Sequence, residues 1–371
     1  MTRLLRILPP ALLTLLLGGG AAWADILIAT AGPMTGPSAA FGEQMRRGAQ
    51  AAVDDINATG GLKGERLALQ VGDDGCDPRK AVDVATSFVS AGVKFVAGHF
   101  CSGSSIPAAK VYETAGIVEI SPTSSNPKFT DDGGWNVARV CARDDAQGVI
   151  AGKYIAAHFA GKRIALASDK SPASQALAAK LRQTLAGAGE SLSFDEIYQA
   201  GGKDYTALAQ KLSDGLADVV YFSANYPEAA MVIKAMRGLG SAAQFIGEDS
   251  LVTDEFWAIA KDNGEGTLMT FAPDPLTFDS AKDVVQHFTD AGFNPEGATL
   301  YAYAAVQAYV QAAEATGGTD SHRIAAWLRA GNRVKTVLGE ISLDAKGDVK
   351  EPKFAWFRWS QGHYGEAPDV Q

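Results

Sequence analysis

Histidine and cysteine are scarce in this chain of 371 residues, which contains five histidines and three cysteines. The zinc signatures Cys-x-x-Cys and His-Glu-x-x-His do not occur. The nucleophile elbow Gly-x-Ser-x-Gly and the phosphate loop Gly-x-x-x-x-Gly-Lys-Ser/Thr are missing too. We therefore expect a protein that is not an enzyme and needs no metal or cofactor. The scattered histidines are interpreted as structural, with His99 as a packing residue.

Basic residues are outnumbered, 33 Lys and Arg against 42 Asp and Glu, giving a net charge of −9. The two signs are mixed along the chain, without the Lys/Arg clusters that nucleic-acid binding needs. Nucleic acid is therefore not an expected partner. Past the N-terminus, no apolar run is long enough to span a bilayer.

The first 24 residues resemble a secretory signal peptide. Arg3 and Arg6 precede an apolar stretch, which ends in the small-x-small sequence 22–24. The stretch is too short to cross a bilayer comfortably, which disfavours the alternative of an uncleaved anchor. Cleavage is predicted after Ala24, and no cysteine follows that would carry a lipid. We expect an exported, periplasmic protein.

Cys76, Cys101 and Cys141 all lie beyond the predicted cleavage site. In an oxidising compartment, one disulfide and one free thiol is the simplest count. Cys76 and Cys101 each follow an expected strand, and neighbouring parallel strands bring such positions together. A zinc site is the weaker alternative. Cys141 is interpreted as an inert, buried thiol at a strand end.

Strand-like and helix-like segments alternate along most of the chain, which predicts α/β lobes with mainly parallel sheets. Residues 25–371 exceed the roughly 250–300 residues at which one core stops growing, so two lobes are expected. The strands are placed at 26–30, 67–71, 95–97, 117–120, 163–167, 193–197, 219–222, 245–247 and 267–271.

The last hundred residues are instead helical, with helices expected at 281–291, 298–316 and 321–330. Short strands follow at 339–343 and 354–359, separated by a turn at 344–348 that we expect to be a solvated hairpin turn. The helices are predicted to pack on the first lobe, so that the chain crosses a hinge several times. The predicted lobes are 25–143 with 273–350, and 144–272 with 351–371.

Two loops rich in Ser, Thr and Gly, 98–105 and 120–127, follow expected strands. Ligands of open α/β sheets bind at such strand ends, where helix N-termini attract anions. Helix capping alone is the alternative for these hydroxyls. In the second lobe, Asp249 is a candidate partner for an ammonium group, whereas Glu248 is expected to face solvent near a helix N-terminus.

A series of short motifs resembles the periplasmic substrate-binding proteins of branched-chain amino acid ABC transporters, the Leu/Ile/Val-binding family. The resemblance covers essentially all of the chain after the signal peptide and implies a two-lobed Venus-flytrap fold. The motifs are GPMTGP at 32–37, FGEQ at 41–44, DDIN at 54–57, GGLKG at 60–64, DDGCDP at 73–78, GHFCS at 98–102, YPE at 226–228 and QFIG at 244–247.

The resemblance also assigns roles to individual residues. It implies that Ser102 holds a ligand carboxylate, and that Thr123 and Ser125 contact carboxylate or ammonium. Asp249 would bind the α-ammonium, and Phe41 would cover the side chain. The disulfide of the family falls on Cys76 and Cys101.

Three positions depart from the family pattern. Asp249 replaces the usual Glu, Ala173 replaces a Tyr, and Asn225 replaces another aromatic residue, with Tyr226 adjacent. These changes leave an amino-acid head group plausible and open the pocket to polar, larger or aromatic side chains.

The resemblance implies a monomeric binding protein that closes on an amino acid or a related zwitterion and delivers it to an ABC permease in the membrane. One alternative is a sensor that presents its ligand to a receptor. Another is a binder of an amide, urea or an aromatic acid.

Overall fold

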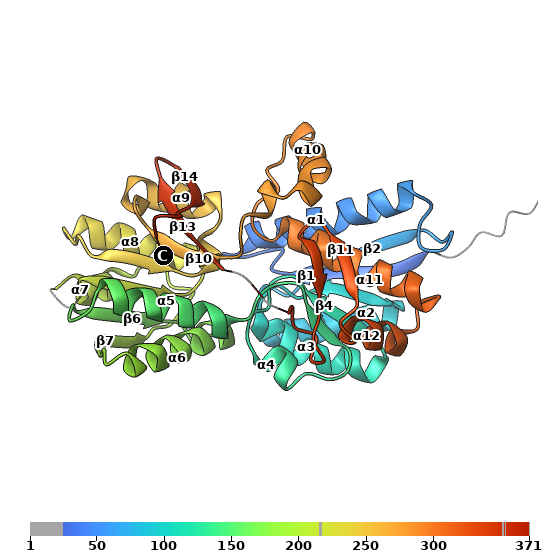
Figure 1. Cartoon of the computed structure of the whole chain (residues 1–371), viewed down its shortest axis with the longest axis horizontal. Coiled ribbons are helices and arrows are strands. Elements are labelled where there is room, and N and C mark those ends of the chain that lie inside the picture. Colours follow the sequence, from blue (N-terminus) through green and yellow to red (C-terminus); the bar gives the residue numbers. More distant parts are fainter. Residues whose placement is uncertain (1–24, 215–216, 351, 353, 371) are drawn as a thin grey trace, which may run out of the picture.

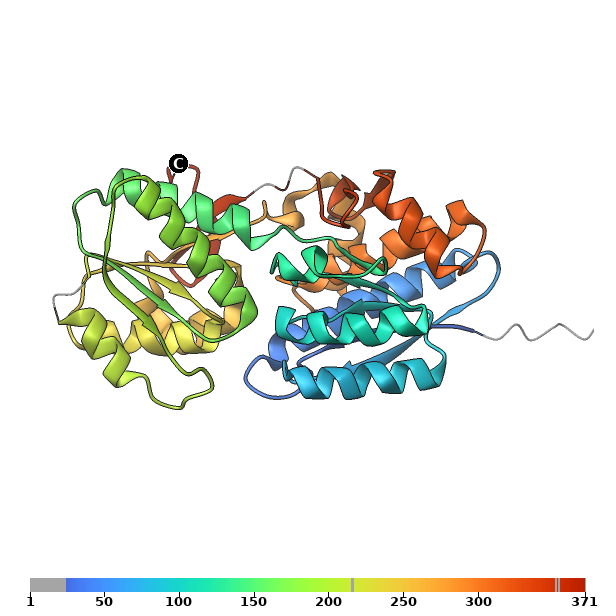
Figure 2. The ribbon, with the colours of Figure 1, turned by 90° about the horizontal axis from the view of Figure 1, so that it is seen from below.

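The computed structural model describes residues 25–214, 217–350, 352 and 354–370, so the predicted signal peptide lies outside the described residues. These residues form two lobes that lie side by side along the long axis of the molecule (Figures 1 and 2). Within the ranges just given, no helix combines the length and the apolar character needed to span a membrane.

The first lobe is built on a parallel five-stranded sheet in the order β2-β1-β3-β4-β5. Helices from the N-terminal third and from the C-terminal block cover it (Figure 1). The strands are β1 (Ile26–Gly32), β2 (Leu67–Asp73), β3 (Phe95–Gly98), β4 (Val118–Ser121) and β5 (Val137–Arg139). The helices are α1 (Ala39–Ala58), α2 (Pro78–Ala91), α3 (Ser102–Ala115), α4 (Lys128–Asp131), α10 (Lys282–Asp290), α11 (Thr299–Thr316) and α12 (Ser321–Arg329).

The second lobe holds a seven-stranded sheet in the order β14-β13-β10-β9-β8-β6-β7, in which β13 pairs antiparallel with both β10 and β14 and the other pairs are parallel. The strands are β6 (Ile164–Ser168), β7 (Leu192–Ile197), β8 (Val219–Ser223), β9 (Gln244–Gly247), β10 (Leu268–Phe271), β13 (Ala355–Ser360) and β14 (His363–Glu366). The helices are α5 (Asp144–His158), α6 (Pro172–Gly187), α7 (Thr206–Ser213), α8 (Tyr226–Gly238) and α9 (Asp254–Ala260).

The C-terminal helices pack on the first lobe, as the sequence predicts. Helix α11 is buried along most of its length and shares a core with β3 through Phe95 and Tyr309, whose rings stack at 4.2 Å. It approaches α1 so closely that a Cβ on Gly48 would lie 2.0 Å from the carbonyl oxygen of Thr299. Only glycine allows this approach, and it fixes the C-terminal block to the N-terminal one.

The chain passes from the first sheet to the second after β5, returns after β10, and supplies β13 and β14 to the second sheet. Several connections between the lobes favour hinge motion over free rotation about one linker. The lobe boundaries near residues 143, 272 and 350 remain predictions.

The turn at 344–348 is a hairpin turn, closed by an antiparallel bridge between Leu343 and Val349, but it differs from the sequence prediction in its strand partner and in its solvation. Strand β12 (Gly339–Ser342) pairs with β11 (Arg333–Thr336), whereas β13 belongs to the other lobe. Asp348 is buried, with an oxygen 2.7 Å from Nε of the fully buried Arg139. A buried guanidinium requires a counter-charge, and the turn supplies it from a distant part of the sequence.

Arg139 connects this turn to the loop after β4. Its guanidinium donates hydrogen bonds to the carbonyl oxygens of Ser124 and Asn126, the latter at 3.0 Å. Arg143 adds a second cation, with Nη1 2.7 Å from the Asp348 carboxylate. A buried ion pair therefore holds the Ser/Thr-rich loop after β4 in place.

We predict that Asp348→Ala destabilises the protein strongly, because it leaves the Arg139 charge buried without a partner. Loss of one member of a buried pair costs about 3–5 kcal/mol. Denaturant unfolding followed by circular dichroism measures the change. The matched control is Asp279→Ala, which removes an exposed partner of Lys282 and should leave the curve unchanged. Equal curves for the two variants would contradict the prediction.

Candidate functional site

A cavity of about 410 Å³ lies between the lobes, at the carboxyl ends of the strands of both sheets. It falls within the roughly 300–1,000 Å³ of small-molecule sites. Both lobes line it, and the lining includes these predicted residues: Phe41, Cys76, Cys101, Ser102, Thr123, Ser125, Ala173, Asn225 and Asp249. Tyr226 is not among the lining residues and instead packs against Phe41 at 5.1 Å between ring centroids.

The first lobe presents hydroxyls and amides to the cavity. Ser102 is the first residue of α3; the amides of Ser104 and Ser105 donate to the Cys101 carbonyl oxygen, whereas those of Ser102 and Gly103 come before the first hydrogen bond of the helix. The Ser102 Oγ accepts a hydrogen bond from the Asn126 amide at 3.3 Å. Thr123 lies on the neighbouring loop, and its hydroxyl donates to the carbonyl oxygen of Phe100 at 2.8 Å. This wall is suited to a small anion such as a carboxylate.

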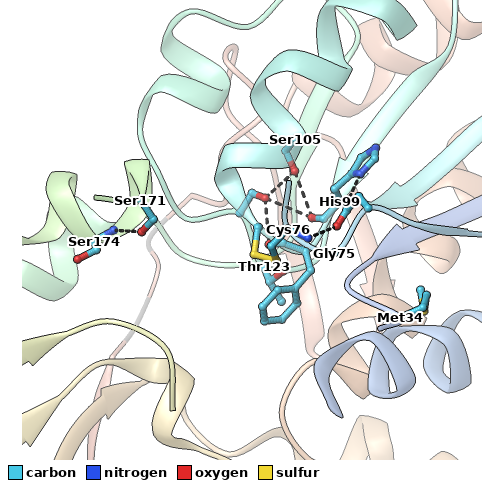
Figure 3. The surroundings of a disulfide bond; sticks show 12 residues. Met34, Gly75, Cys76, His99, Ser105, Thr123, Ser171 and Ser174 are labelled. Atoms are coloured by element: carbon cyan, nitrogen blue, oxygen red, sulfur yellow. Dashed lines mark hydrogen bonds and ion pairs between the residues drawn. A yellow bond between two sulfur atoms is a disulfide. The ribbon is translucent and has the colours of Figure 1, made fainter. Parts of the chain in front are cut away.

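The predicted disulfide between Cys76 and Cys101 is confirmed, with the two Cα atoms 5.5 Å apart. It joins the loop after β2 to the residue that precedes α3, beside Thr123 (Figure 3). Both sulfurs are used in this bond, so the zinc alternative is wrong. The disulfide restrains the N-terminus of α3, where Ser102 lies.

Cys141 is the free cysteine, and it lines the cavity rather than lying wholly in the core. Its desolvated surroundings raise the pKa of the thiol to about 12. The group therefore stays a neutral thiol at physiological pH, in agreement with the inert role expected from the sequence.

His99 has more than the packing role expected of it. Its Nδ1 lies 2.6 Å from an oxygen of Asp74 and its Nε2 lies 2.9 Å from the hydroxyl of Tyr112, all fully buried. The His99 carbonyl oxygen accepts hydrogen bonds from the hydroxyls of Ser121 and Ser105, at 2.8 and 3.2 Å. Figure 3 shows His99 and Ser105 of this network near the disulfide, and the bonds from Ser105 and Ser121 to the His99 carbonyl join the two hydroxyl-rich loops.

The second lobe presents carboxylates to the same cavity. Asp249 follows β9 at the start of a single 3₁₀ turn, Asp249–Leu251. Burial raises its pKa to about 6. Its neighbour Glu248 is 7% exposed and also lines the cavity. Burial, and then the charge of Asp249, raise the pKa of Glu248 well above its usual value.

The expectation that Glu248 faces solvent is therefore wrong. Strand β9 lies between β8 and β10, so the residue that follows it is covered on both sides by neighbouring loops. The sequence alone gives no sign of this, because strand order is a tertiary property.

Asp144 is a functional candidate that the sequence reasoning missed. It begins α5 directly after the first crossing between the lobes and is 1% exposed. Its carboxylate hydrogen-bonds to the side chain of Ser125, while burial raises its pKa to about 7. The sequence shows an acid at the start of a helix that follows a strand, which is one sign of a functional residue. It does not show that the acid is buried.

The two lobes touch beside the cavity. Phe41 stacks on Phe100 of the same lobe at 4.6 Å, and both rings pack against the hydrophobic cluster of the second lobe. The Tyr226 hydroxyl donates a hydrogen bond to the Pro37 carbonyl oxygen at 3.1 Å, and the side-chain amide of Asn126 donates one to the Pro172 carbonyl oxygen. The structure thus represents the lobes in contact around the site.

Comparisons with known proteins agree with this architecture. The family described as periplasmic binding protein matches residues 25–363. The chain belongs to this family. It is 44% identical over 361 residues to the Leu/Ile/Val-binding protein homolog 1 of Brucella melitensis, with 97% of each chain covered. The family resemblance drawn from the sequence motifs is thereby confirmed.

Solved structures show the same fold at lower identity. The leucine-binding protein LivK of Thermotoga maritima superposes with a TM-score of 0.85 at 24% identity, over 93% of this chain and 99% of that one. A solute-binding protein of an ABC transporter from R. palustris, in complex with 4-hydroxybenzoate, gives 0.82 at 18% identity, over 93% and 96%. The two-lobed periplasmic binding protein fold is thus established for this chain.

No group of three or more His, Cys, Asp or Glu side chains arranged to hold a metal ion occurs in the part of the chain that the structure describes. The acids of the cavity wall therefore have to find their positive partner in a ligand or remain partly protonated.

We predict that Asp249→Asn stabilises the ligand-free protein at high pH. Because the folded pKa of about 6 exceeds the ordinary 3.8, the folded state holds a proton that the unfolded chain releases in this window. Stability is therefore lost as the pH rises through the window, and the variant escapes that loss. The gain should be on the order of 2 kcal/mol at about pH 8 and small near pH 4.

Denaturant unfolding of the ligand-free proteins at the two pH values measures this difference. Asp83→Asn, which changes an exposed acid on α2, is the matched control and should show no pH-dependent gain. A loss of stability in Asp249→Asn at high pH would show that the carboxylate has a favourable partner within the protein.

Proposed function

We propose that this protein binds an amino acid, or a closely related zwitterion, between its lobes and delivers it to a membrane permease of an ABC importer. The observation that carries the proposal is the opposite polarity of the two walls of one cavity. Hydroxyls and helix amides face it from the first lobe, and Asp249 faces it from the second. A ligand that carries both a carboxylate and an ammonium group satisfies both walls at once.

Each wall contributes half of the recognition. The carboxylate of the ligand lies at the N-terminus of α3, within reach of Ser102 and of the loop that holds Thr123 and Ser125. The ammonium pairs with Asp249, which shifts that carboxyl toward its charged form. Phe41 covers the side chain, and the space beside Ala173 and Asn225 admits a larger one.

Binding is coupled to closure because neither lobe alone satisfies the ligand. The ligand shifts an open–closed equilibrium by the difference between its affinities for the two states. Contacts such as Phe41 with Tyr226 and Asn126 with Pro172 then form on closing. A permease that contacts both lobes would recognise the closed form.

The family supports the remaining parts of the proposal. The closely related Brucella protein carries the name of a Leu/Ile/Val-binding protein, which favours amino-acid transport over sensing. We propose that residues 1–24 direct the chain to the periplasm and are removed after Ala24, and that the protein works as a monomer without enzymatic turnover.

An aromatic acid is the second candidate ligand, because the R. palustris protein with the same fold was solved in complex with 4-hydroxybenzoate. The acidic wall argues against it here. When the lobes close on a ligand that has a carboxylate and no cation, Glu248 and Asp249 lose water and gain no positive partner. The cost of desolvating these carboxylates would then oppose binding.

Isothermal titration calorimetry of the purified, dialysed protein with the twenty L-amino acids and with 4-hydroxybenzoate tests the function. We predict that amino acids bind and that Asp249→Asn lowers their affinity by roughly 100-fold, because a buried ammonium loses its charged partner. Asp83→Asn should bind normally. Binding of 4-hydroxybenzoate with no response to any amino acid would reject the amino-acid assignment.

A further inference from the structure

The mechanism proposed above uses one carboxylate of the second lobe and leaves another unexplained. Glu248 is 7% exposed, lines the cavity, and has no hydrogen-bond donor or cation on its carboxylate within the described part of the chain. Its oxygens are not among the fully enclosed side-chain atoms that lack a partner, so they keep contact with the cavity, where a carboxylate that has lost most of its water is costly unless it is paired. Its retention in the wall of a binding cavity points to a partner that arrives with the ligand.

The surroundings of Glu248 are acidic as well. Asp169 is 4% exposed and lines the same cavity, and its carboxylate accepts a hydrogen bond from the Ser171 amide at 2.7 Å. Asp249, Asp144 and Asp169, in that order, act on Glu248 with like charge. The basic residue on the cavity lining is Lys170, whose side chain is exposed and forms no ion pair with these acids.

The excess of acidic over basic side chains on this wall limits which ligand side chains fit the cavity. A single α-ammonium balances Asp249 and leaves Glu248 and Asp169 uncompensated. A branched aliphatic side chain would cover the Glu248 carboxyl with hydrocarbon and offer no hydrogen bond. A side chain with a terminal cation supplies both charge and donors, and its methylenes find apolar surface on Phe41, Phe100 and Val252.

We propose that the preferred ligand is an amino acid with a cationic side chain, of the arginine and lysine class, whose terminal cation pairs with Glu248 beside Asp169. The inference rests on the proposed function, since Asp249 is taken to bind the α-ammonium. It assigns Glu248 as the residue that sets side-chain specificity.

Calorimetric titration with L-arginine, L-lysine and L-leucine tests the inference on the full mature protein. Wild type should bind L-arginine or L-lysine roughly 10- to 100-fold more tightly than L-leucine, the gain expected of a charged hydrogen bond in a buried site. Glu248→Gln keeps the shape and removes the charge. It should weaken the binding of the cationic amino acids by a similar factor and strengthen that of L-leucine.

Glu314→Gln is the matched control, because Glu314 is exposed on α11 and does not line the cavity. It should change neither affinity. Thermal unfolding of ligand-free Glu248→Gln should show no loss of stability, so that weaker binding is not a folding defect.

The outcomes separate this inference from the function on which it rests. L-Leucine binding as tightly as L-arginine, or a preference for L-arginine that survives Glu248→Gln, would overturn the specificity assignment and leave amino-acid binding intact. Failure of all amino acids to bind would overturn the proposed function together with this inference.

Discussion

Parallel strands in both lobes end at edges that face one shared cavity, and the rest of the site depends on this constraint. In the first lobe, the helix that follows β3 turns its N-terminal amides toward the cavity. In the second, the residues that follow β9 are acids. Because each polarity comes from a different lobe, a ligand that needs both holds the lobes together.

The acidic wall carries a cost that the ligand-free protein bears. Asp249 on this wall has a raised pKa because burial disfavours its charged form, as has Asp144, which does not line the cavity, and Glu248 has neither a counter-ion nor a donor among the described residues. Arg139, a buried cation five residues before Asp144, does not neutralise these acids. It pairs with Asp348 and donates to carbonyl oxygens of the loop after β4. The protein thus fixes the loop after β4 with an internal ion pair, whereas Glu248 and Asp249 on the opposite wall have no cation from the described residues beside them.

Much of this could be predicted from the sequence, because local patterns determine it. The alternation of strands and helices, the positions of Cys76 and Cys101, and the Ser/Thr loops at strand ends follow from periodicity and spacing. The sequence does not reveal the burial of Glu248 and Asp348, for one shared reason. Their burial depends on which strands and turns become neighbours, as when β10 covers β9 or the turn at 344–348 meets β5. His99 was underestimated likewise, since Asp74 and Tyr112 reach it from other elements.

The buried acids also connect closure of the lobes with selectivity for the ligand. Closure removes water, which strengthens attraction to a matched cation and raises the cost of an unmatched carboxylate. Under the proposal made above, a ligand that leaves Glu248 unpaired would therefore oppose closure, whereas one that pairs it would favour closure. If a permease recognises only the closed lobes, the residue that discriminates among side chains also decides which ligands are delivered. Specificity would then come from the free energy of closure, which differs between ligands. The contacts of Phe41 and Asn126 between the lobes would be the same for every ligand.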